Sequence, residues 1–487
     1  MNIKKIIVNN KNVLDELFAR DKFLYLIKDN FLKFAKIQEI CKDKFIIATG
    51  HQPIFYYPGI IFKNYFISKI AKELDGLPIN FVVDTDIANI NIPVPGKVNN
   101  NYYKKYIKIA NPEKLCYAWF KPARKEVKNF FVDIEKIVKT LNHKDILKSF
   151  RKYTKRFFYF YEKNKNFIET IIFLRQEFEK LYKFPVLDLK VSEISKSIGF
   201  YNFVWLIIKN IEDFVDIYNE ATKLNIKRKK NIYQPVKLLY NEKNIYELPF
   251  WYIKGKRYRL FIKKNNNKLH FLGENNLSLI EIDQANKGEA EIINILKKNI
   301  IIFPKAITLT MILRMFFSDL FIHGTGGASY DKVTNYILKK FFKLKDELKY
   351  LIVTGNIYLP LDIDINKIEE KYIEKKRWLN NVKYHPEKFM NKELAEYYIG
   401  EKRKLSLQLN RTKNPAERRK IHNKLKSIHQ EMVDFFKRRI EIVEETIKDY
   451  EKILKYKDVF LEREYPYFFY LENINFSEIL NKYLEYK

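Results

Sequence analysis

The chain has little cysteine and little glycine: two cysteines, Cys41 and Cys116, and 13 glycines among 487 residues. Two cysteines cannot build a disulfide framework, so we expect a reducing compartment, the cytoplasm. Scarce glycine beside 34 tyrosines and 39 phenylalanines argues against a fibrous or disordered protein. No apolar run approaches the roughly 20 residues that span a bilayer. The N-terminal residues also lack the apolar stretch of a signal peptide. We therefore expect no membrane partner.

Basic residues are abundant, and the net charge is +32 at pH 7. Residues 222–270 contain 14 Lys and Arg and two Glu. Residues 101–160 contain 16 Lys and Arg and five acidic residues. Such an excess attracts polyanions, including nucleic acid. Two other interpretations are a small anionic substrate and a compositional bias that runs through the whole chain.

The hydrophobic pattern predicts an α/β fold. Residues 44–48 form an expected strand, residues 58–74 an amphipathic helix and residues 77–83 a second strand, which makes one βαβ unit with parallel strands. A second unit follows with a helix at 309–317 and a strand at 320–322. It continues with a helix at 329–343 and a strand at 350–353. Such crossovers build a parallel sheet, and open sheets of this kind bind ligands at the carboxyl ends of their strands.

The rest of the chain divides around these units. Residues 1–96 and 304–362 are expected to be the two halves of the core, and residues 97–303 an insertion between them. The insertion is mostly helical up to about residue 230. Alternating runs at 256–262 and 268–272 then predict a small antiparallel sheet. Residues 466–487 form a tail.

Residues 363–465 are charged and helical in pattern. Asn414 and Pro415 are typical of a helix start. Apolar residues from Ile421 to Leu454 then recur at steps of four and three, close to a heptad repeat with slippage near Phe436. A weaker apolar stripe runs from Leu394 to Leu409. The pattern predicts an antiparallel helical hairpin, a coiled coil that would make a homodimer.

The first candidate site follows the strand at 44–48. Thr49, Gly50, His51 and Gln52 are expected to form a loop that opens a helix, where backbone N–H groups favour an anion. His51 would donate to that anion, or it is only a local hydrogen-bonding residue.

The second strand ends at Asp84 and Asp86. These carboxylates would orient a substrate amine or hold Mg²⁺. The alternative is that they cap the next turn.

The second candidate site follows the strand at 320–322. Several glycines in a short loop let backbone N–H groups converge on a phosphate. The loop lacks the Lys of a Walker A motif. The candidate phosphate-binding residues are His323, Gly324, Thr325, Gly326, Gly327, Ser329 and Tyr330, with Asp331 as an acid–base candidate. The scattered histidines show no metal-ligand spacing, so we expect no protein-bound metal centre.

These motifs resemble, in order, those of the BshC family, the enzymes that add cysteine in bacillithiol synthesis. Residues 49–53 resemble the family's Thr-Gly-Gln-Gln loop, and residues 84–86 its Glu-Asp-His-Asp turn. Residues 324–330 resemble its Gly-Gly-Pro-Gly-Glu-x-x-Tyr stretch, and a helical hairpin closes both chains. His51 stands in place of a Gln, and the acidic turn lacks the family's His.

The resemblance implies a Rossmann-like core, a dimerising coiled-coil arm and a carbon–nitrogen ligase. Family members join cysteine to the amine of a glucosamine–malate conjugate. A divergent member would use other substrates, with ATP or ADP as nucleotide. In this interpretation His51, Asp84, Asp86 and Asp331 are catalytic. The alternative is a nucleic-acid-binding protein that uses the basic middle segment, with an inactive core.

Overall fold

The computed structural model describes residues 3–8, 44–99, 101–225, 237–242, 244–265, 267–324, 327–344, 348, 350–361, 363–471 and 484–486. The chain divides into two compact units. The larger unit comprises residues 3–96, 105–359 and 463–487, and the smaller one residues 97–104 and 360–462. Each unit is described by itself below.

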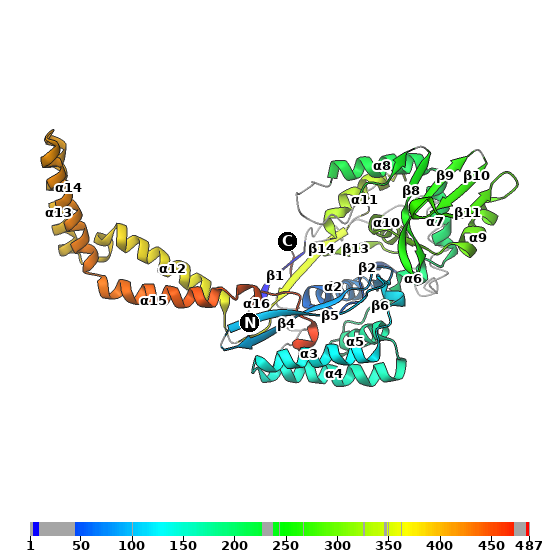
Figure 1. Cartoon of the computed structure of the whole chain (residues 1–487), viewed down its shortest axis with the longest axis horizontal. Coiled ribbons are helices and arrows are strands. Elements are labelled where there is room, and N and C mark those ends of the chain that lie inside the picture. The colour runs from blue at the N-terminus through cyan, green and yellow to red at the C-terminus, as the bar shows by residue number, and fades with distance from the viewer. Residues whose placement is uncertain are drawn as a thin grey trace. The chain divides into compact units, whose positions relative to one another are not determined.

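The larger unit is a mixed α/β structure built on a seven-stranded sheet with the order β15-β1-β14-β13-β2-β3-β6 (Figure 1). The five strands from β14 to β6 are parallel, which confirms the predicted α/β class. β1 is antiparallel to β14 and parallel to β15. The strands are β1 (Ile3–Val8), β2 (Ile46–His51), β3 (Leu77–Val82), β6 (Leu187–Lys190), β13 (Leu320–His323), β14 (Tyr350–Ile357) and β15 (Leu484–Tyr486).

Helix α2 (Pro58–Glu73) connects β2 to β3, as predicted. Pro58 occupies the first helical position, where its missing N–H costs nothing. The helix packs on β14, β2 and β3. The predicted loop at Thr49–His51 is wrong, because these residues belong to β2 and lie opposite Asn80–Val82 of β3. Pairing with β3 extends the strand, and α2 begins only seven residues after His51.

The other helices of the larger unit form two groups. α3, α4 and α5 pack in sequence, and α4 also packs on the 3-10 turn Tyr467–Phe469. The second group shares its core with the antiparallel sheet, and in it α8 contacts α11 and α7 contacts α9. The helices are α3 (Arg124–Thr140), α4 (Lys144–Asn164), α5 (Phe167–Leu181), α6 (Val191–Ile194), α7 (Ile198–Lys209), α8 (Ile211–Asn225), α9 (Glu289–Asn299), α10 (Ala306–Phe316) and α11 (Ala328–Lys340).

A separate antiparallel sheet lies in the middle of the chain, where the alternating runs predict it. Its order is β11-β10-β9-β8-β12, and β7 pairs with β8. Gly255 makes the tight turn between β8 and β9 with a φ of 71°. The strands are β7 (Asn241–Glu242), β8 (Ile245–Lys254), β9 (Lys256–Asn265), β10 (Lys268–Leu272), β11 (Ser278–Asp283) and β12 (Ile302–Pro304). A further pair is β4 (Ile90–Val98) with β5 (Asn101–Ile109).

The smaller unit consists mainly of two helix pairs, α12 with α15 and α13 with α14 (Figure 1). Helices α12 and α15 run antiparallel, as the ion pairs Lys376–Glu451 and Lys383–Glu444 show. The predicted start at Asn414 is confirmed, because its side chain accepts from the Ala416 N–H. The helices are α12 (Ile365–Tyr384), α13 (Lys392–Arg411), α14 (Pro415–Asp434), α15 (Lys437–Leu454) and α16 (Lys457–Phe460).

The apolar repeat of this unit is divided between two helices. α14 ends at Asp434 and α15 begins at Lys437, so the break falls at the slippage near Phe436. Phe436 and Ile440 pack with Val382 of α12 in one small core. Among the residues that the structure describes, no helix has both the length and the hydrophobicity to cross a bilayer.

Candidate active site at the sheet edge

The candidate residues collect at the carboxyl ends of the parallel strands. His51 ends β2, His323 ends β13, and Asp84 follows β3. Parallel neighbours end on the same edge of a sheet, so residues distant in sequence meet there. The Thr49 hydroxyl donates to the carbonyl oxygen of Ile322 over 2.8 Å and ties β2 to β13.

Lys63 of α2 is a buried cation at this edge, with a relative exposure of 6%. Its Nζ donates to the carbonyl oxygen of Gly50 over 3.1 Å. A Cβ added to Gly324 would lie 4.0 Å from Cδ of Lys63, so the aliphatic part of the Lys63 side chain lies beside the residue that follows β13. Burial lowers the pKa of Lys63 to about 8. Within the described ranges, no acidic side chain forms an ion pair with it. A buried charge without a counter-ion is costly, which makes Lys63 a candidate anion contact.

His51 lies beside Lys63 and is neutral at pH 7. Burial lowers its pKa to about 3, and the positive charge of Lys63 adds to the effect. Its Nδ1 lies 3.1 Å from the carbonyl oxygen of Gln52. A carbonyl only accepts, so this hydrogen bond requires the tautomer with hydrogen on Nδ1 and leaves Nε2 as a proton acceptor.

His323 faces a buried ion pair. Its Nε2 lies 2.9 Å from Oδ2 of Asp331, and Oδ1 of Asp331 accepts from Nη1 of Arg314 over 2.8 Å. Nη2 of Arg314 also donates to the carbonyl oxygen of Leu348. Burial lowers the pKa of His323, although Asp331 acts in the opposite direction. Asp331 is thus held by Arg314 and lies next to His323.

The expected phosphate cradle is described only in part. Thr325 and Gly326 lie outside the described residues, as does the side chain of Ser329. Gly327 is the N-cap of α11, and its carbonyl oxygen accepts from the Tyr330 N–H over 3.0 Å. A Cβ added to Gly327 would lie 2.8 Å from Nδ1 of His323, so Gly327 lies directly against that histidine.

Asp84 lies at the wall of a cavity of about 320 Å³. It accepts from the backbone N–H of Ser192 over 2.9 Å and also from the Ser192 hydroxyl. Burial raises the pKa of Asp84, and the two Ser192 hydrogen bonds oppose the rise. Lys190 and Glu169, which form an ion pair, also line the cavity. Charges of both signs therefore face this space, which suits a polar substrate.

Asp86 lines a second cavity, of about 290 Å³. Its Oδ2 accepts from Nε2 of Gln52 over 3.0 Å, and its Oδ1 pairs with Nη1 of Arg257 at 2.7 Å. Tyr117 lines both cavities, so they adjoin at this side chain. Gln52 and Asp86, predicted as separate site residues, are in direct contact.

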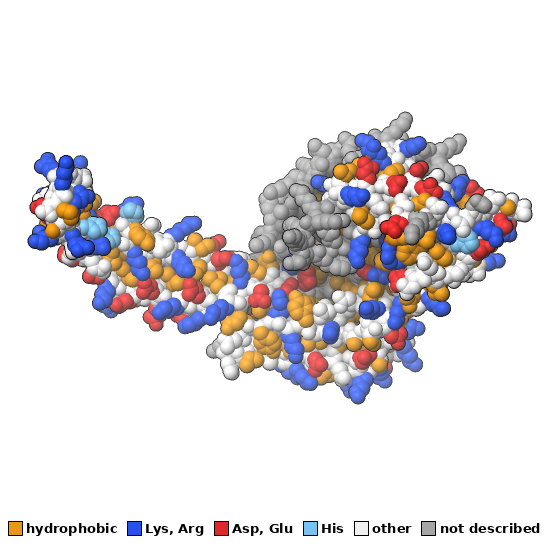
Figure 2. All heavy atoms as spheres, turned by 45° about the horizontal axis from the view of Figure 1, so that its top comes forward, with side chains coloured by type: hydrophobic (Ala, Val, Ile, Leu, Met, Phe, Trp, Pro, Cys, Tyr) orange, Lys and Arg blue, Asp and Glu red, His pale blue; other side chains and the backbone are white. Residues whose placement is uncertain are grey.

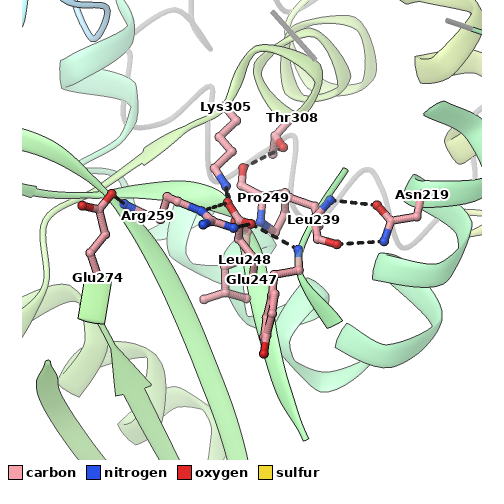
Figure 3. Close-up of polar contacts among 10 residues, drawn as sticks. Asn219, Leu239, Glu247, Leu248, Pro249, Arg259, Glu274, Lys305 and Thr308 are labelled. Carbon is pink, nitrogen blue, oxygen red and sulfur yellow. Dashed lines mark hydrogen bonds and ion pairs between the residues drawn. The ribbon is translucent and has the colours of Figure 1, made fainter. Parts of the chain in front are cut away.

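The antiparallel sheet carries an ion cluster around the buried carboxylate of Glu247 (Figure 3). Nε of Arg259 donates to Oε1 of Glu247 in β8 over 3.0 Å. Glu247 also forms an ion pair with Lys305, which precedes α10. Burial lowers the pKa of Lys305 to about 8, while Glu247 partly offsets that effect. Lys305 and Arg257 both lie 4.9 Å from the ring centre of Trp251. The cluster connects the antiparallel sheet to the start of α10, so we assign it a structural role.

Sequence reasoning missed Lys63, Ser192, Arg257 and Arg314. Lys63 could have been found from the sequence, because Lys63 and Asn64 interrupt the otherwise apolar residues 60–66. The other three gain their roles from partners on distant elements. No His, Cys, Asp and Glu group of the described residues has the arrangement of a metal site. Of the basic segment 222–270, residues 226–236 lie outside the described residues, and Arg257, Arg259 and Lys268 are paired with acids.

No protein-family model and no curated protein sequence matches this chain.

Proposed function

We propose that the protein is an enzyme that binds a small anionic substrate at the carboxyl edge of its parallel sheet. The observation that carries the proposal is the buried Lys63 ammonium, which pairs with no acidic side chain in the described ranges. It lies within electrostatic reach of His51 and His323, where burial lowers the pKa of both and the Lys63 charge acts in the same direction. An anion next to Lys63 would supply the missing negative charge. A phosphate or a carboxylate has this chemistry.

The reaction proposed is formation of an amide bond, as in the BshC family. The amine nitrogen attacks the acyl carbon with its lone pair, and the bond from that carbon to its leaving group breaks. The leaving group keeps the electron pair and remains beside the Lys63 ammonium. The attacking amine loses a proton to the leaving group, and Nε2 of His51, which the Gln52 hydrogen bond leaves without hydrogen, accepts a hydrogen bond from the amine.

The polar cavity at Asp84 is the proposed place of the amine substrate. A carboxylate held by Ser192 can orient an ammonium or amine group, and Asp86 lines the adjoining cavity. ATP is the proposed activating nucleotide: the substrate carboxylate would take the terminal phosphoryl group of ATP and release ADP, so phosphate is the leaving group, and Mg²⁺ would accompany the phosphates. An amino acid and an amino-sugar conjugate are the proposed substrate classes. The Rossmann-like description of the core and a homodimer through the helical arm belong to the same proposal.

Thermal unfolding with added anions tests the anion site. Wild type, Lys63→Met and Lys72→Met are titrated with phosphate, pyrophosphate, malate, ADP and ATP, with and without Mg²⁺. Lys72 is the matched control because it is an exposed lysine of the same helix. A ligand at 100 times its dissociation constant stabilises the folded protein by about 2.7 kcal/mol.

We expect saturable stabilisation of wild type and of Lys72→Met by at least one anion, and none of Lys63→Met. An equal response of Lys63→Met would remove Lys63 as the anion contact. If no anion stabilises wild type, the proposed enzyme loses its main support. Stabilisation by ATP alone would favour the ligase over other reactions of anionic substrates.

A further inference from the structure

Basic residues are concentrated at one end of the helical arm. Residues 402–426 hold ten Lys and Arg and one acid, Glu417. The remaining arm residues, 363–401 and 427–462, hold 15 basic and 17 acidic residues. A compositional bias would enrich both parts, so it does not explain the difference. We call residues 402–426 the basic tip. Its basic residues are Lys402, Arg403, Lys404, Arg411, Lys413, Arg418, Arg419, Lys420, Lys424 and Lys426.

The basic tip comprises the last turns of α13, the turn at 412–414 and the first turns of α14. Figure 2 shows Lys and Arg side chains gathered at the end of this helix pair. All ten basic residues except Lys402 are exposed. Lys404 pairs with Glu401, and Arg418 donates to backbone oxygens of the turn. Among the described residues, the other exposed basic side chains of the tip form no ion pair.

Most of the large apolar residues of the tip face the partner helix. Ile421 is buried, and Leu405, Leu409 and Leu425 are partly buried where α13 packs on α14. Leu407 is an isolated exposed apolar side chain. A helix that lies on a membrane needs a continuous apolar face with aromatic or leucine anchors, and the tip has none. A second copy of the tip is also disfavoured, since two surfaces of the same sign repel each other.

We propose that the basic tip binds the phosphate backbone of nucleic acid. The basic residues extend about 14 Å along α13 and about 12 Å along α14 at 1.5 Å per residue. A duplex carries about one phosphate charge per 1.7 Å of its axis, so the tip matches several phosphates at once. Two adjacent helices are about 20 Å wide, too wide for a major groove of about 12 Å. The contact is therefore to the backbone, independent of base sequence, and independent of the proposed enzymatic reaction.

Fluorescence anisotropy of labelled nucleic acids tests this surface on the full chain. The probes are double-stranded RNA, double-stranded DNA and single-stranded RNA of one length, each at 50 and 200 mM salt. The tip variant is Arg419→Glu, Lys420→Glu and Lys424→Glu. The matched control is Lys121→Glu, Lys125→Glu and Lys128→Glu, which changes the same charge at exposed positions of the larger unit.

We expect wild type and the control to bind and to lose about 150-fold to 2,000-fold in affinity between the two salt concentrations, for about four to six phosphate contacts. The tip variant should lower the slope of log affinity against log salt by about 2.7, or 0.9 for each lost contact. Circular dichroism checks that the helices are retained. Arg411→Glu with Lys413→Glu, at the turn, serves as a second tip variant.

Three outcomes would overturn the proposal. In the first, wild type does not bind any probe at 50 mM salt. In the second, both tip variants bind as tightly as the control. In the third, wild type binds vesicles that contain phosphatidylserine but none of the nucleic acids, which would identify a membrane surface as the partner.

Discussion

Gly59 of α2 and Gly355 of β14 lie against each other. A Cβ atom added to Gly59 would be 3.0 Å from the carbonyl oxygen of Gly355. One turn further along α2, the ring of Phe62 occupies the space where a side chain of Gly355 would lie. This contact fixes how close α2 comes to the sheet and how the helix is rotated. Because Lys63 follows Phe62, the same contact directs the Lys63 ammonium to the end of β2.

Gly355→Ala should destabilise the larger unit. The added methyl group would overlap the ring of Phe62, which is 1% exposed and has no space to move into. Overpacking of this kind costs about 1–3 kcal/mol or more. The control is Gly400→Ala in α13, where an added Cβ meets nothing within 4 Å. That change should stabilise its helix by up to about 1 kcal/mol. Denaturant unfolding followed by circular dichroism measures both, and equal effects would contradict the close contact.

Arg175→Met should destabilise the protein strongly. The Arg175 guanidinium pairs with Glu179 and Asp188, and all three side chains are at most 8% exposed. Burial raises the pKa of Glu179 to about 7, and Arg175 opposes the rise. Without Arg175 two carboxylates remain buried together, which costs about 3–5 kcal/mol.

The exposed pair of Arg151 and Glu135 gives the comparison for this ion cluster. Arg151→Met should cost less than about 1 kcal/mol in the same denaturant titration. Adding Asp188→Asn to Arg175→Met should recover part of the lost stability, because one of the two buried charges is then absent. A double variant that is no more stable than Arg175→Met would show that packing, and not charge, decides the effect.

Lys63→Met should change how stability depends on alkaline pH. The pKa of Lys63 is about 8 in the folded chain and has its ordinary value of 10.5 after unfolding. Between these values the unfolded chain binds the proton more strongly, so the contribution of Lys63 to the free energy of unfolding rises with pH. The stability of wild type relative to Lys63→Met should therefore increase from pH 7.5 to pH 9.5. Lys72→Met is the control. If the stability difference between wild type and Lys63→Met stays constant over this pH range, the ammonium of Lys63 is not desolvated.

The hydrophobic pattern predicted four of the five parallel strands, α2 and the antiparallel strands β9 and β10, because burial on one face imposes periodicity on the residues themselves. It missed β6, which falls in the part expected to be mostly helical. It placed the end of β2 wrongly. Whether Thr49–His51 continue the strand depends on pairing with β3, and the residues around position 50 do not reveal that pairing. Counting apolar positions also passed over Lys63, although a lysine inside an apolar run is itself evidence of a buried charge. The pair of Asp86 with Arg257 joins two distant elements, so spacing could not reveal it.

His51→Asn should reduce the loss of stability in acid. The pKa of His51 is about 3 when folded, because of burial and then Lys63, against an ordinary value of 6.5. Between pH 6.5 and pH 3 the unfolded chain takes up a proton that folded His51 refuses, so the free energy of unfolding falls as the pH falls. Removing His51 should flatten this decline by at most about 1.4 kcal/mol per pH unit.

Denaturant midpoints at pH 7 and pH 5 measure this effect, and His422→Asn at an exposed position of α14 is the control. His323 is also buried with a lowered pKa, so part of the acid dependence should persist in His51→Asn. Lys63→Met should raise the pKa of His51 by removing the adjacent charge and give an intermediate slope. If His51→Asn and His422→Asn lose the same stability from pH 7 to pH 5, His51 accepts protons freely in the folded state. An imidazole that is charged at pH 5 in the folded protein would contradict the desolvation of His51.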